Sequence, residues 1–121
     1  MARVEIPYKF PSYNEYQNLN RKNPYAGASR KKQIEKDIAW FLNRLPEFKE
    51  PVWIHFHWIE GNHKRDLDNV SFAKKFILDA LVKQGKLVND NTKYVVGFMD
   101  TIEFMREWKV IVEIKEVEDG L

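Results

Sequence analysis

The sequence predicts a single α+β domain in which two amphipathic helices pack on a mixed sheet. Three observations predict this class. The length of 121 residues suits one ordinary core, apolar residues recur at helical spacing in two segments, and they alternate at strand spacing in four others. No repeat, low-complexity tract or linker divides the sequence. We therefore expect one domain over residues 1–121 with the order β-α-β-α-β-β.

The first strand is expected at residues 4–10, where the sequence "VEIPYKF" alternates. Pro7 would confine this strand to a sheet edge or a bulge, because proline donates no ladder hydrogen bond. Residues 11–29 are rich in Asn, Tyr, Ser and Gly and have no sustained period. This part is predicted to be a long surface segment, a kind that is often functional or disordered.

The first amphipathic helix is expected to follow Ser29, which can cap it, and to stop at Pro46. Its apolar positions fall at i, i+4, i+7, i+8 and i+11: Ile34, Ile38, Phe41, Leu42 and Leu45. The strand "PVWIHFHWIE" at residues 51–60 comes next. Its apolar residues occupy both faces, so we expect both faces to be largely covered.

The second amphipathic helix is predicted over residues 69–84, and Gly85 is expected to end it. Its buried positions are expected to be Phe72, Ala73, Phe76, Ile77, Ala80 and Leu81. Residues 94–104 and 108–117 are then predicted to form two antiparallel strands joined by a short turn.

The composition is that of a globular protein, with 44% hydrophobic residues for a core and 31% charged residues to cover it. No apolar run approaches the roughly 20 residues that span a bilayer, and the N-terminus lacks the pattern of a signal peptide. We therefore expect neither membrane insertion nor export. The sequence has no cysteine, which excludes disulfides, thiol catalysis and thiolate zinc sites and fits a cytoplasmic protein.

The net charge of +2 is small, but the charges are distributed unevenly. Residues 21–36 contain six basic groups against one acid, and residues 63–86 contain six against three. Residues 100–119 reverse the balance, with seven acids against three bases. A basic middle favours an anionic partner such as nucleic acid, although two helices with solvated basic faces would give the same pattern.

Asp66 and Asp68 stand one residue apart at the entrance to the second helix. In an extended segment their side chains would point to the same side and repel each other, unless a divalent cation or a basic group neutralised them. The alternative is that Asp68 or Asn69 caps the helix and Asp66 is a solvated turn residue. An EF-hand loop is excluded, because Ser71 and Ile77 occupy its sixth and twelfth positions.

His55 and His57 form an H-x-H pattern, a spacing that zinc sites use. Their neighbours Trp53 and Ile59 indicate a packed face instead, and His63 is the one further candidate ligand. We expect packing rather than zinc binding here.

Four short segments together resemble a known family: "RDLDN" at residues 65–69, K-x-x-L-D-A-L at 75–81, Gly85, and "VNDN" at 88–91. They are similar to the RusA-type Holliday-junction resolvases, which are small dimeric Mg²⁺-dependent endonucleases common in phages and prophages. The similarity extends to "PSYNEY" at residues 11–16 and to the closing strands. It implies a homodimer acting on branched DNA, a four-way junction, in the cytoplasm of a bacterial or phage-infected cell, with no small-molecule cofactor.

The same resemblance implies particular roles. Three aspartates would bind Mg²⁺, for which Mn²⁺ can substitute, and one lysine would be catalytic: Asp66, Asp68, Asp90 and Lys75. Two features depart from the family pattern. Asn89 stands where the later acidic pair usually has its first acid, and the usual spacing from D-x-D-N to the lysine is shorter than here. Anchoring on residues 78–81 selects Lys75, with Lys74 as the other candidate.

Lys75 and Asp79 are also spaced i, i+4, in the order that makes such a pair worth only a few tenths of a kcal/mol. A structural or supporting role is expected for Asp79, with Lys75 or Lys83 as its partner. Basic and polar side chains would hold the DNA backbone. Four lie near the aspartates and three at the start of the first helix: Lys64, Arg65, Asn69 and Lys74, then Arg30, Lys31 and Lys32.

The resemblance implies hydrolysis of phosphodiester bonds that leaves a 5′ phosphate. The loop at residues 12–25 is a candidate for junction contact, or else packs on the sheet. Two other functions stay open. One is a catalytically silent protein that binds DNA junctions with the same fold, and the other is a structural protein whose Asp-x-Asp only caps a helix.

Overall fold

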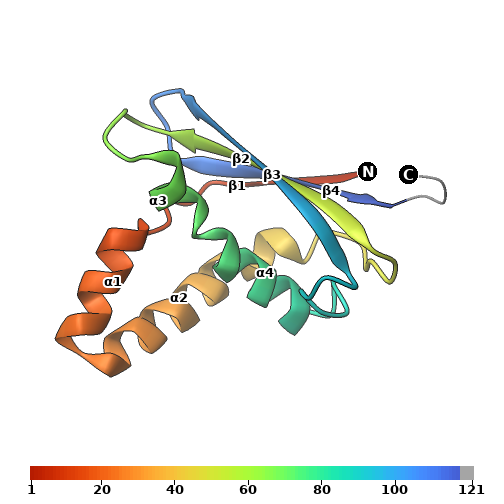
Figure 1. Cartoon of the computed structure of the whole chain (residues 1–121), viewed down its shortest axis with the longest axis horizontal. Helices are drawn as coiled ribbons and strands as arrows, with labels where there is room; N and C mark the ends of the chain where they lie inside the picture. Colours follow the sequence, from red (N-terminus) through yellow and green to blue (C-terminus); the bar gives the residue numbers. More distant parts are fainter. Residues whose placement is uncertain (118–121) are drawn as a thin grey trace.

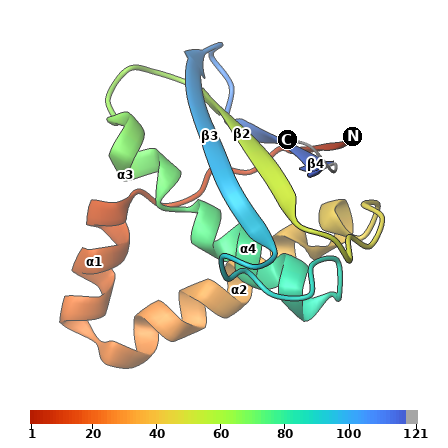
Figure 2. The same ribbon diagram turned by 45° about the vertical axis from the view of Figure 1, so that its right-hand side comes forward.

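The computed structural model describes residues 1–117 and has the predicted α+β class. Its four strands form one mixed sheet in the order β1-β4-β2-β3. The strands are β1 (Ala2–Ile6), β2 (Val52–Glu60), β3 (Val95–Phe104) and β4 (Lys109–Glu116). The helices are α1 (Tyr13–Lys22), α2 (Pro24–Leu42), α3 (Leu67–Ser71) and α4 (Lys74–Lys83). They lie on one face of the sheet (Figures 1 and 2).

Strand β1 is an edge strand, and it ends immediately before Pro7. It pairs antiparallel with β4, and its inward side chains Val4 and Ile6 are buried. The expected placement at an edge is confirmed, and the strand is shorter than predicted because proline cannot continue the ladder.

The prediction of a surface loop over residues 11–29 is wrong, because α1 and the first turns of α2 occupy this segment. A capping box begins α1: the Glu15 amide donates to Ser12 Oγ, and the Ser12 amide donates to Glu15 Oε1. Helix α2 is capped by Asn23, not Ser29. Helix α1 has no fully buried residue, so no apolar period announces it, and the S-x-x-E signal at residues 12–15 was the available clue.

The predicted second helix is divided into α3 and α4 by a turn at residues 72–73. Its end is as expected: Gly85 adopts the left-handed conformation with φ 73°. The Lys86 amide then donates to the Leu81 carbonyl and the Gly85 amide to the Val82 carbonyl, which completes a Schellman motif.

The predicted hairpin of the last two strands is wrong, because β2 lies between them. Strand β3 pairs parallel with β2, and β4 pairs antiparallel with the other edge of β2. The helices α3 and α4 form the crossover that a parallel pair requires. The expectation that both faces of β2 are largely covered is wrong. Its even-numbered side chains are buried beneath the helices, whereas on the opposite face Trp53 is 47% exposed and His55 and His57 are half-buried. Figure 2 shows β3 at the edge of the sheet.

The core fills the space between the sheet and helices α2 and α4. Ile34, Ile38, Phe56, Phe76 and Leu81 are each 2% exposed or less. Within residues 1–117, none of the helices has the length and apolar character needed to cross a membrane.

Candidate functional site

Asp66 and Asp68 lie at the entrance of α3, where both are exposed. Asp66 occupies the N-cap position, with φ −77° and ψ 154°, but its side chain makes no capping hydrogen bond. Asp68 already lies in the first turn of the helix, so the same-side geometry of an extended segment does not apply to this pair. Among residues 1–117 neither carboxylate has a hydrogen bond or an ion pair, so neither side chain caps the helix, and Asp66 occupies the N-cap position that was expected for Asp68 or Asn69.

Arg65 fixes the chain immediately before these aspartates. Its Nε and Nη2 donate to the two carboxylate oxygens of Glu60 at 2.7 and 2.9 Å, and its Nη1 donates to the Phe10 carbonyl at 2.7 Å. The side chains of Arg65 and Glu60 are only 12% and 6% exposed. The guanidinium is therefore engaged within the molecule, and Arg65 can neither neutralise Asp66 nor reach a phosphate without giving up these bonds.

The sequence reasoning missed this role of Glu60. A glutamate at the end of an otherwise apolar strand, with an arginine five residues later, was the signal. The Arg65–Glu60 ion pair connects the segment before α3 to the end of β2. The hydrogen bond from Arg65 to the Phe10 carbonyl connects it to the segment before α1 as well.

Asp90 lies in the loop after α4, which doubles back along that helix. Its Oδ2 accepts a hydrogen bond at 3.1 Å from Nζ of Lys75, in the first turn of α4. The Asp90 amide donates to Asn89 Oδ1 at 2.7 Å, an acceptor that an aspartate at position 89 would equally provide. The predicted metal ligands are thus divided between the entrance of α3, with Asp66 and Asp68, and the start of α4, with Asp90.

Lys75 contacts two carboxylates, because its Nζ also lies 3.1 Å from Asp79 Oδ1. The hydrogen bonds that Lys75 donates, first to Asp79 and then to Asp90, raise the pKa of Lys75 above its usual value. Asp79 in turn accepts from Lys31 at 2.6 Å. Burial alone would raise the pKa of Asp79, but the hydrogen bonds from Lys31 and Lys75 outweigh it and hold the pKa below 3.8.

Lys74 points to a different group. It pairs with Asp100 of β3, and its Nζ lies 4.8 Å from the ring centre of Phe98. Asp100 also accepts from Trp58 Nε1 at 2.9 Å. Lys74 therefore joins α4 to the sheet, and the geometry favours Lys75 as the lysine beside Asp90.

Some of the other residues predicted to contact DNA are bound to side chains of the protein, and others are exposed. Arg30 donates to the Tyr8 hydroxyl at 3.0 Å, and Lys31 is bound to Asp79. Lys32 and Lys64 are exposed, and Asn69 is half-buried beside Asp68. Contact of these residues with DNA stays a prediction, and Lys32 and Lys64 are best placed for it.

The two strand histidines interact with other polar side chains of the sheet face that carries no helices. His55 Nε2 and His57 Nδ1 lie 2.7 and 2.5 Å from Thr101 Oγ1. His55 also pairs with Glu113, and His57 with Glu103. Across residues 1–117, no three His, Asp or Glu side chains gather closely enough to hold a metal ion.

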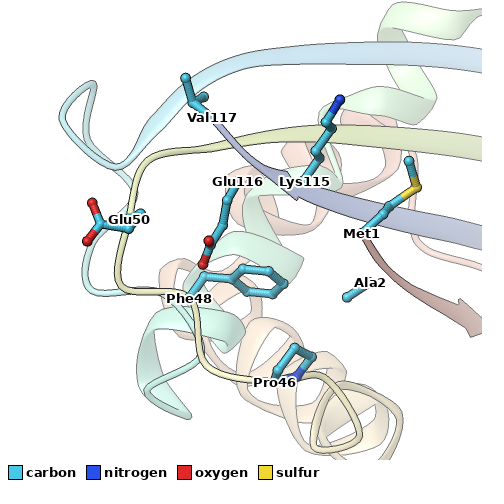
Figure 3. Close-up of a pocket in the computed structure, with 8 residues that line it drawn as sticks. All are labelled: Met1, Ala2, Pro46, Phe48, Glu50, Lys115, Glu116 and Val117. Carbon is cyan, nitrogen blue, oxygen red and sulfur yellow. The ribbon is translucent and has the colours of Figure 1, made fainter. Parts of the chain in front are cut away.

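A hollow of about 790 Å³ lies at the far end of the sheet, between Met1, Phe48 and Lys115 (Figure 3). None of the predicted site residues lines it. A smaller hollow of about 290 Å³ includes Asp66 together with Phe104 of β3. The candidate site is therefore the smaller hollow and the exposed surface beside it.

No protein-family model matches the chain, and no curated protein matches it.

Proposed function

We propose that this protein is a Mg²⁺-dependent endonuclease that cuts four-way DNA junctions and related branched DNA, leaving 5′ phosphates. One observation carries the proposal. Asp66 and Asp68 are exposed at one helix entrance, and nothing within residues 1–117 neutralises or caps them. Carboxylates that are exposed and have no partner in the described part of the protein are free to bind a divalent cation.

The donor set fits a hard cation. Asp66 and Asp68 offer carboxylate oxygens, which Mg²⁺ prefers, and Mg²⁺ keeps several of its waters, so few protein ligands suffice. Asp90 is the proposed third ligand, and reaching the ion requires it to share its carboxylate with Lys75. When bound, the metal would activate a water and polarise the phosphodiester.

The other residues then have separate tasks. Lys75 would stabilise the negative charge that develops on the phosphoryl oxygens, because its ammonium is exposed and already lies beside a proposed ligand. Lys64 and Lys32 would hold phosphates of the DNA backbone. Such contacts carry little base information, so selectivity would come from the shape of the junction.

The test compares a labelled four-way junction with a matched linear duplex, in Mg²⁺ or in EDTA. Paired nicks confined to the junction, dependent on metal and absent in Asp68→Asn, are the expected result. Glu47→Gln is the matched control, since Glu47 is an exposed acid in the loop before β2. Equal cleavage by wild type and Asp68→Asn would reject the proposal.

A second function, a catalytically silent protein that binds junctions, is favoured by one observation. The three proposed ligands do not form a metal-holding cluster among residues 1–117. Tight junction binding without cleavage in either Mg²⁺ or Mn²⁺ would select this alternative.

A homodimer is part of the proposal, because two sites related by a two-fold axis suit a junction with paired strands. The free edge strand β3 supports association, since Val96, Phe98, Ile102 and Phe104 are each about 40% exposed. Sedimentation equilibrium measures the mass directly, and a mass of 14.5 kDa at micromolar concentration would contradict the dimer.

A further inference from the structure

Charged side chains of alternating sign connect α2, α4 and the loop that follows α4. Lys31 of α2 donates to Asp79 Oδ2 at 2.6 Å. Asp79 Oδ1 lies 3.1 Å from Lys75 Nζ, which lies 3.1 Å from Asp90 Oδ2. The series ends on two of the residues proposed for catalysis.

We infer that Asp79 is a positioning residue that holds the Lys75 amine beside Asp90, and that Lys31 fixes Asp79 for this task. The consequence for cleavage rests on the proposed function, whereas the ordering of Lys75 does not. Asp79 itself touches neither of the exposed aspartates at the entrance of α3 in any hydrogen bond or ion pair among residues 1–117.

Stability explains the contact between Asp79 and Lys75 poorly. The Lys75 side chain is 62% exposed, and an exposed ion pair of this orientation contributes little to folding. The contact that joins the two helices is the one with Lys31, whose side chain is 35% exposed. Each carboxylate oxygen of Asp79 thus has its own lysine, and of these two contacts only the one with Lys31 connects α4 to α2.

Positioning explains the same contact well. A lysine side chain has four rotatable bonds and would otherwise sample many rotamers on this exposed face. A cation held by Asp90 would also repel the ammonium that shares its carboxylate. Asp79 supplies a second negative charge on Lys75, so the amine can stay in place when Asp90 is occupied.

The experiment compares Asp79→Asn with Lys83→Met as the matched control. Lys83 also pairs across α2 and α4, with Glu35, but does not contact Lys75. The motion of each lysine Nζ is measured by ¹⁵N NMR relaxation in the metal-free protein, with Lys75→Arg assigning the Lys75 signal. We expect a restrained Lys75 amine in the wild type and in Lys83→Met. In Asp79→Asn it should become clearly more mobile, because Asp90 alone then holds it.

Junction cleavage provides the second measurement. Asp79→Asn should lower kcat by about 10- to 100-fold and leave KM for the junction nearly unchanged, as for a residue that orients another group. Lys83→Met should change neither value. If Asp79→Asn does not fold, Asp79→Glu keeps the charge on a longer side chain and should leave Lys75 partly restrained and kcat intermediate.

Two results overturn the inference. One is a Lys75 amine that is equally mobile in the wild type and in Asp79→Asn, and the other is a released amine with unchanged kcat. If the wild type cleaves no junction in Mg²⁺ or Mn²⁺, the proposed function fails, and the NMR comparison still decides whether Asp79 orders Lys75.

Discussion

The Arg65–Glu60 ion pair before α3 and the two aspartates at the entrance of α3 lie close together in the chain and use their charges in opposite ways. Arg65 is enclosed and bound to Glu60, with 12% and 6% of their side chains exposed. Asp66 and Asp68 follow within three residues, are exposed, and have no partner among residues 1–117. Burial separates the two cases: an enclosed charge must be paired, whereas an exposed charge is free to bind a ligand.

The Lys31–Asp79 ion pair between α2 and α4 is intermediate in its exposure to solvent. The side chains of Lys31 and Asp79 are 35% and 17% exposed. We therefore expect the cost of removing a charge to fall in the order Arg65–Glu60, Lys31–Asp79, then the entrance of α3. Four predictions test this order.

The largest expected effect on stability is at Glu60. Glu60→Gln would leave the enclosed Arg65 guanidinium with the exposed Glu15, 3.6 Å from its Nη1, as its remaining counter-charge, and we expect a loss of about 3 kcal/mol of unfolding free energy. Urea unfolding measures the loss. Removing both charges in Glu60→Gln, Arg65→Met should cost less than Glu60→Gln alone, and a single-variant loss below about 1 kcal/mol would contradict the enclosed pair.

Asp68→Asn should affect cleavage strongly and stability very little, the opposite of what is expected at Glu60. We expect cleavage to fall by about 100-fold or more, which corresponds to about 2.7 kcal/mol in the barrier. The unfolding free energy should change by no more than about 0.5 kcal/mol, because an exposed side chain without a partner is altered. Single-turnover cleavage and urea unfolding of the same preparation separate the two effects. A large loss of stability would show that Asp68 is structural.

Lys31→Met should have an intermediate effect. It removes the partly exposed pair with Asp79 between α2 and α4, and we expect a loss of about 1 kcal/mol. Thermal unfolding measures it, with Lys32→Met, an exposed neighbour on the same helix, as the control. Equal melting temperatures for the two variants would mean that the Lys31 pair contributes nothing.

The smallest effect is on the pH dependence of stability. The pKa of Asp79 is lower in the folded protein than its ordinary value of 3.8. Its contribution is therefore complete above pH 3.8 and is lost as the pH falls through the lower folded value. Urea unfolding between neutral and acidic pH should show a smaller acid loss in Lys31→Met than in the wild type. Parallel pH profiles would contradict the shift.

The sequence predicted the α+β class, the strand at residues 51–60, two amphipathic helices and the stop at Gly85, because each has a local signal; the division of the second helix into α3 and α4 was not predicted. Helix α1 was missed because it buries no residue fully, so its only signal is the capping box at Ser12 and Glu15. The pairing of β3 was missed because a short turn favours a hairpin, whereas in the structure β2 lies between β3 and β4.

The same division holds for the site. The sequence by itself determined which residue types are present: the spaced aspartates, a nearby lysine pair and a later aspartate. Only the tertiary structure decided which of them are engaged, turning Arg65 inward to Glu60, Lys74 toward Asp100 and Lys75 toward Asp90. The physical reason is that a charge contacts whichever opposite charge the packing brings near it, and for these side chains those partners lie between 5 and 26 residues away along the chain.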